Sequence, residues 1–95
     1  MLAKKDESVA RRLRTLQAYA ISQGYAENQT QMAEHLGISE PRWTQMLNSR
    51  DLSKEVAFKI VEKFPEVTLE WLWLGKTEGL RLQTLRELEA AAKNL

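Results

Sequence analysis

Hydrophobic side chains recur along the chain at steps of three and four residues, which is the spacing of one face of an α-helix. The first such stripe consists of Val9, Leu13, Leu16 and Ala20. It predicts a helix over about residues 8–23, and Gly24 follows it with the conformational freedom that ends many helices. Hardly any stretch alternates between apolar and polar residues as a strand does, so we expect an all-α fold.

Residues that can cap a helix divide the rest of the chain into five further segments. The expected N-caps are Asn28, Ser39, Ser53 and Thr68. Each has a side-chain oxygen that can accept a hydrogen bond from the first helical turn. Gly37 and Gly75 mark two helix ends, and Pro65 marks a third because the residue before a proline disfavours helical backbone. The last helix is expected from about residue 77 or 78 to residue 93.

Length and charge limit the class of protein. The 95 residues suffice for one domain, and 14 basic against 13 acidic residues give a net charge of +1, so any surface for nucleic acid has to be local. Basic residues gather near the front of the chain at Lys4, Lys5, Arg11, Arg12 and Arg14. This cluster fits a solvated helix face as well as a DNA contact. No stretch resembles a membrane span or a signal peptide, so we expect a cytoplasmic protein without a membrane partner.

The chain lacks the residues from which most catalytic and metal sites are built. It has no cysteine, which excludes thiol nucleophiles, zinc ribbons and iron–sulfur clusters. Its single histidine, His35, makes a catalytic triad hard to assemble and is expected to lie at the surface of the second helix. We therefore expect no enzymatic activity, no metal, no cofactor and no small-molecule ligand.

The most informative stretch is residues 29–48, QTQMAEHLGISEPRWTQMLN, where two short helices meet across a three-residue connection that begins at Gly37. Trp43, Met46 and Leu47 are apolar at positions that fill the angle between the helices. A step of about 100° per residue then turns the opposite side of the third helix outward. That side carries Pro41, Gln45 and Asn48, with Thr44 beside them.

A short helix with compact polar side chains on its outer face can enter the major groove of DNA. Gln45 can form a bidentate pair with adenine, Glu40 can accept from cytosine N4, and Pro41 can touch a thymine methyl group. Gln29 at the start of the second helix and Asn48 at the end of the third are expected to approach DNA phosphates. Arg42, Arg50 and Lys54 add positive charge for the DNA backbone.

These twenty residues resemble the helix-turn-helix of the lambda-repressor and Cro-like (Xre-type) superfamily. They carry Ala at the fifth place, Gly at the ninth, and apolar residues at the fourth, eighth, tenth, fifteenth and eighteenth. The resemblance covers about residues 9–80 and includes a Trp-Leu-x-x-Gly run that ends at Gly75. It implies a compact five-helix DNA-binding domain over residues 1–76. It also implies that Glu40, Pro41, Thr44 and Gln45 face the groove, while Gln29, Arg42 and Asn48 contact the backbone.

The C-terminal segment, residues 77–95, carries a narrow leucine seam made of Leu82, Leu85, Leu88 and Leu95. The seam either folds back on its own domain or pairs with the same helix of a second copy. We favour the pairing, since a narrow seam flanked by charges suits helix association and two-fold dimers bind half-sites one DNA turn apart. The expectation is a homodimeric regulator of double-stranded DNA, a repressor that acts by covering its operator.

A second function stays open. The same helical scaffold suits a protein-interaction adaptor, such as an antitoxin-like or antirepressor subunit. The near-zero net charge and the carboxylate of Glu40 favour this alternative, because both weaken the attraction to phosphates.

Overall fold

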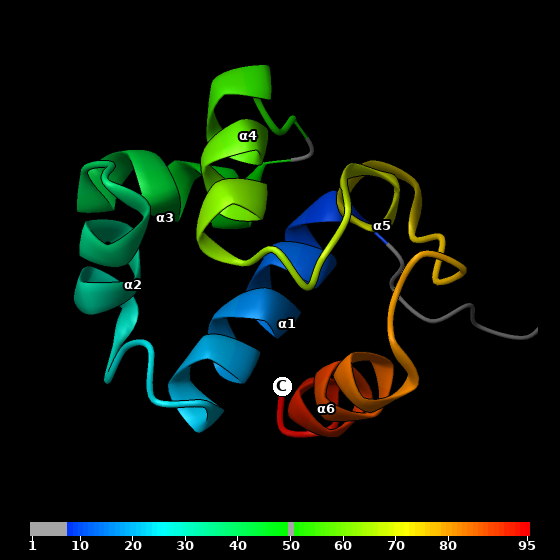
Figure 1. Cartoon of the computed structure of the whole chain (residues 1–95). Helices are drawn as coiled ribbons and strands as arrows, with labels where there is room; N and C mark the ends of the chain where they lie inside the picture. The colour runs from blue at the N-terminus through cyan, green and yellow to red at the C-terminus, as the bar shows by residue number, and fades with distance from the viewer. Residues whose placement is uncertain (1–7, 50) are drawn as a thin grey trace, which may run out of the picture.

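The computed structural model describes residues 8–49 and 51–95. In that part of the chain it contains six α-helices and no strand, which confirms the predicted all-α class (Figure 1). The helices are α1 (Val9–Ser22), α2 (Gln29–Leu36), α3 (Glu40–Asn48), α4 (Lys54–Lys63), α5 (Leu69–Leu74) and α6 (Leu82–Ala92). Figure 1 shows α1 in the middle, with α2 and α3 on one side and α6 on the other.

All four predicted N-caps are confirmed. The side chain of Asn28 accepts from the backbone N–H of Gln31 at 2.9 Å, and Thr68 accepts from Trp71 at 3.0 Å. Ser39 and Ser53 cap α3 and α4 in the same way. Each cap gives one of the first backbone N–H groups of its helix an acceptor, which is why these residue types predict helix starts well.

The end of α5 depends on a contact from α1. The guanidinium of Arg12, whose residue is 9% exposed, donates from Nε to the Leu72 carbonyl and from Nη2 to the Trp73 carbonyl, both at 3.0 Å. These are carbonyls of the last helical turn, which lack partners within the helix. Gly75 follows with φ +73°, and a Cβ there would lie 3.0 Å from Arg12 Nη1. The buried guanidinium of Arg12, which comes from α1, therefore stabilises the end of α5 at Gly75.

The last helix begins at Leu82, so the predicted start at residue 77 or 78 was wrong. The intervening residues form a turn in which Leu80 N–H donates to the Thr77 carbonyl at 3.0 Å. A Cβ at Gly79 would lie 3.2 Å from Thr68 Cγ2, so this turn packs against the loop that precedes α5.

Among the described helices, α6 packs on α1 alone (Figure 1). Its buried residues are Thr84, Leu88 and Ala91. At its end, Arg11 Nη2 donates to the Ala92 carbonyl at 3.2 Å, and Gln23 Nε2 donates to Glu87 at 3.2 Å. One face of α6 is therefore part of the chain's own core.

This packing corrects the predicted leucine seam. Leu88, one of its four members, is buried against its own chain and is not available to a second copy. Leu82 and Leu95 are 62% and 50% exposed, and Leu85 is half-buried. Leu82 and Leu88 are six residues apart and so point about 120° apart on α6, and Leu95 lies beyond the end of that helix, so the four leucines do not share one face.

His35 also differs from the expectation of a surface residue. It is half-buried, and its ring centroid lies 5.4 Å from those of Tyr25 and Phe64. Its Nε2 atom is buried and has no hydrogen-bond partner within the described part of the chain. The residue belongs to an aromatic cluster beneath α2.

Candidate nucleic-acid interface

The turn between α2 and α3 positions the candidate interface. Gly37 adopts φ +77°, and its N–H and that of Ile38 donate to the carbonyls of Glu34 and Ala33, both at 3.0 Å. Ser39 then caps α3. Ala33 is buried in α2, on which α3 packs. The small side chain and the left-handed glycine thus allow the two helices to cross closely.

The two sides of α3 have the predicted environments. Trp43 is 0% exposed and Leu47 is buried, while Met46 is half-buried against the core. On the opposite side the exposed residues are Pro41, Gln45 and Asn48, and Glu40 is exposed at the first position of the helix. Within the described part of the chain, the side chains of Glu40 and Gln45 make no hydrogen bond, so both are available to a partner.

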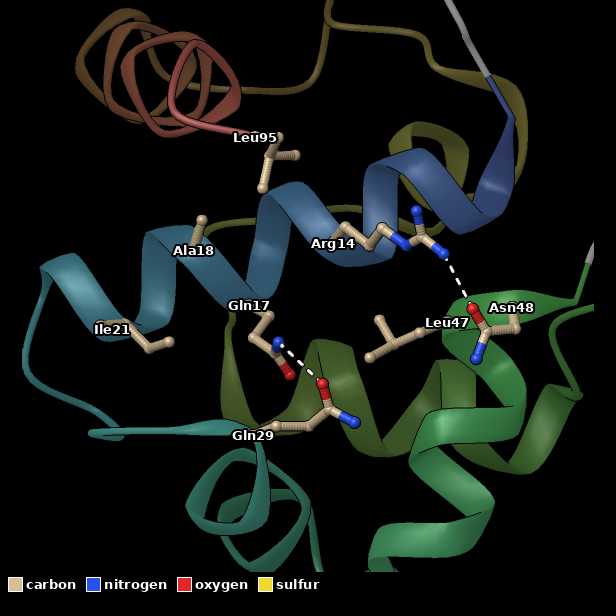
Figure 2. A pocket seen from close by; sticks show the side chains of 8 residues that line it. All are labelled: Arg14, Gln17, Ala18, Ile21, Gln29, Leu47, Asn48 and Leu95. Atoms are coloured by element: carbon tan, nitrogen blue, oxygen red, sulfur yellow. Dashed lines mark hydrogen bonds between the residues drawn. The ribbon is translucent and has the colours of Figure 1, made fainter.

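Thr44 and Gln29 contact each other. Gln29 Nε2 donates to Thr44 Oγ1 at 2.8 Å. Gln29 Oε1 also accepts from Gln17 Nε2 at 3.4 Å, and Figure 2 shows this second bond. Both residues of the pair are half-buried. A predicted phosphate contact and a predicted groove-facing residue are therefore joined, because the start of α2 lies beside the middle of α3.

Arg14 of α1 is an addition that the sequence did not single out. Its Nη2 donates to Asn48 Oδ1 at 2.8 Å, as Figure 2 shows. Asn48 Nδ2 in turn donates to the Thr44 carbonyl at 3.0 Å. The side chain is exposed and brings a positive charge to the end of α3. The only signal in the sequence was its place in the basic cluster, of which Lys4 and Lys5 lie outside the described residues.

The remaining residues predicted to contact the DNA backbone differ in whether their charge is paired within the protein. Arg42 Nη2 forms an ion pair with Glu55 Oε1 of α4 at 2.9 Å, and this bond and charge lower the pKa of the Glu55 carboxyl. The charge of Arg42 is thus partly neutralised within the protein. Lys54 is exposed at the start of α4, and Arg50 lies outside the described residues.

An open groove of about 420 Å³ adjoins these residues (Figure 2). It is lined by Arg14, Gln17, Ala18, Ile21, Gln29, Leu47, Asn48 and Leu95. The polar members come from α1 and from the ends of α2 and α3 that face it, and the apolar members form the rest of its wall. The groove brings the polar edge of α1 to the same surface as the two helices of the motif.

No protein-family model, no curated protein and no solved structure matches this chain. The resemblance to the lambda-repressor superfamily therefore stays a prediction from residues 29–48 and the segment that follows them. Across residues 8–49 and 51–95, no helix is long and apolar enough to cross a membrane. The same residues contain no cluster of three or more His, Cys, Asp or Glu that could hold a metal ion.

Proposed function

We propose that this chain is a sequence-specific DNA-binding transcriptional regulator with a lambda-repressor-like fold, and that it acts in the cytoplasm as a dimeric repressor. The observation that carries the proposal is the division of α3 between Trp43, which is 0% exposed, and Gln45, which is exposed without a hydrogen-bond partner in the described part of the chain. Residues two positions apart on a helix, as these are, point in directions that differ by about 200°. Burial of one therefore turns the other outward.

The outer side of α3 is small enough to enter a major groove. Gln45 can bind adenine N6 and N7 together, since an amide both donates and accepts. Glu40 can accept from a cytosine amino group, and the ring of Pro41 can contact a thymine methyl group. All three side chains are exposed on one helix of nine residues.

Phosphate contacts would hold this helix in register. Gln29 at the first turn of α2 and Asn48 at the end of α3 flank the outer side, and Arg14 supplies a cation next to Asn48. Exposed Lys54 supplies a second cation at the start of α4. Backbone N–H groups at a helix N-terminus also favour phosphate, which adds the start of α2 to this set.

The dimer uses the part of α6 that does not pack on α1. Leu82, the accessible part of Leu85 and exposed Ala90 remain as apolar contacts on a helix whose other exposed residues are charged or polar. Two copies paired there would place two α3 helices on neighbouring half-sites and prevent polymerase from using the operator.

The proposal is tested by selecting duplexes from a random pool with the full chain and by measuring affinity against salt concentration. A regulator that makes several phosphate contacts should lose about 0.9 units of log affinity per contact for each unit of log salt. The ion pair of Arg42 with Glu55 and the exposed carboxylate of Glu40 are the features that favour the adaptor alternative. A pool that yields no enriched duplex, with no salt-dependent binding, would support that adaptor instead.

A further inference from the structure

Four polar side chains from three helices form a continuous chain of hydrogen bonds behind the outer side of α3. Trp43 Nε1 donates to Gln17 Oε1 at 2.6 Å. Gln17 Nε2 donates to Gln29 Oε1 at 3.4 Å, the bond drawn in the middle of Figure 2, and Gln29 Nε2 donates to Thr44 Oγ1 at 2.8 Å. The chain starts at a fully buried indole and ends at a half-buried hydroxyl next to the proposed DNA surface.

The direction of every bond in this chain follows from its first member. An indole nitrogen can donate but cannot accept, so Gln17 has to turn its carbonyl oxygen toward Trp43. Its amino group then faces Gln29, which has to present its own carbonyl oxygen and directs its amino group at Thr44. One buried donor thus fixes two side-chain amides, each of which could otherwise take either orientation.

These fixed orientations determine which hydrogen bonds the hydroxyl of Thr44 can make. Its oxygen already accepts from Gln29, so its proton is left to donate elsewhere. Within the described part of the chain this proton has no acceptor. Thr44 lies between the exposed residues Pro41 and Asn48 along α3, so the free donor lies at the edge of the surface proposed to meet DNA.

We infer that Gln17 is a positioning residue, which makes Thr44 meet DNA as a hydrogen-bond donor. This inference rests on the proposed DNA binding. The partner of Thr44 is an acceptor atom, either a phosphate oxygen or an acceptor on a base edge such as guanine O6 or thymine O4. The hydroxyl proton cannot be donated to the amino groups of cytosine and adenine, which are themselves donors.

Gln17→Glu is the variant that reverses the chain. The new carboxylate still accepts from the Trp43 indole, but it cannot donate to Gln29. Gln29 therefore has to turn its amino group toward the carboxylate and its carbonyl oxygen toward Thr44. The hydroxyl proton of Thr44 is then used inside the protein and is lost to DNA.

A double-mutant cycle separates this effect from the added negative charge. Dissociation constants are measured for the full chain, Gln17→Glu, Thr44→Val and the double variant, on a duplex selected by the full chain and on a random-sequence duplex of equal length. Thr44→Val is expected to weaken binding about fivefold, the effect of one neutral hydrogen bond. Gln17→Glu alone is expected to weaken binding more than Thr44→Val does, because it adds a negative charge and also removes the Thr44 donor. In the Thr44→Val background only the charge acts, so the loss of affinity caused by Gln17→Glu should be about fivefold smaller there.

The two duplexes identify the acceptor. A loss on both from Thr44→Val assigns a phosphate oxygen, and a loss on the selected duplex alone assigns a base edge. Equal losses from Gln17→Glu in both backgrounds would overturn the inference while leaving DNA binding intact.

A measurement without DNA keeps the two proposals distinguishable. In the free protein, the side-chain amide resonances of Gln29 should move in NMR spectra of Gln17→Glu and also of Trp43→Phe, which removes the donor that starts the chain. Trp43→Phe also serves if Gln17→Glu does not fold. Unchanged Gln29 resonances would overturn the inference whatever the affinities are. If the Gln29 resonances move in these variants but the protein binds no duplex, the proposed function would be overturned instead.

Discussion

Neighbouring residues of α3 carry separate tasks, and Gln45 is the clearest case. Its side chain is exposed and makes no hydrogen bond within the described part of the chain, so Gln45→Ala should leave the melting temperature unchanged. Loss of a bidentate contact should cost about 1–3 kcal/mol in binding to the selected operator. Binding to random-sequence duplexes serves as the control and should barely change. An equal loss on both duplexes would show that Gln45 does not read bases.

Trp43→Ala should act on the fold instead. The side chain is fully buried, and its indole donates to Gln17. Removal of a large buried aromatic group is expected to lower the free energy of unfolding by about 3–5 kcal/mol, measured by urea denaturation. Met46→Ala on the same helix is a matched control that should cost less, because Met46 is only half-buried. If Trp43→Ala unfolded at the same urea concentration as the wild type, the inward assignment of this side of α3 would be wrong.

At the scale of elements, the end of α5 is where two helices depend on each other. Gly75→Ala should lower the free energy of unfolding by more than Gly24→Ala does. Both glycines have positive φ, at +73° and +86°, so both substitutions carry about 1–2 kcal/mol of left-handed strain. Only at Gly75 would the Cβ also approach Arg12 Nη1, at 3.0 Å, whereas nothing lies within 4 Å at Gly24. Thermal denaturation of both variants makes the comparison, and equal losses would mean that the Arg12 contact adjusts freely.

The sequence predicted where the helices start better than it predicted how the helices pack on one another. The N-caps Asn28, Ser39, Ser53 and Thr68 act on backbone groups within three residues, so short stretches of sequence suffice to find them. The start of α6 was missed because no side chain marks it: its N-cap, Arg81, makes no side-chain cap hydrogen bond. The ion pair of Arg42 with Glu55 was missed because it joins two different helices.

For the whole molecule, Tyr19 links stability to pH. It is buried, and burial, followed by the 2.6 Å hydrogen bond to Glu66, raises its pKa well above the ordinary value of 10.0. Above about pH 10 the unfolded chain loses this proton while the folded chain keeps it, so stability should fall by at most about 1.4 kcal/mol per pH unit. Denaturation at several pH values should show a smaller fall for Tyr19→Phe. Glu66→Gln should keep most of the fall, since burial is the larger cause, and an identical slope in Tyr19→Phe would contradict the assignment.

Assembly is tested on the two leucines of α6 that have opposite environments. Leu82 is 62% exposed, so Leu82→Asp should abolish dimer formation in sedimentation experiments while the chain keeps its helical content in circular dichroism. Leu88 is buried against α1, so Leu88→Ala should lower the free energy of unfolding by about 2–5 kcal/mol. A wild-type chain that stays monomeric at high concentration would remove the dimer from the proposal.

The sequence by itself determined the all-α class, the starts of α2 to α5 and the inward side of α3. These depend on hydrophobic period and on caps, both of which act within a few residues. The tertiary structure decided that α6 folds back through Leu88, that Arg14 reaches Asn48, and that Gln17 lies between Trp43 and Gln29. Such contacts depend on how the helices cross, because side chains distant in the sequence are brought together only by the packing of the helices around α1.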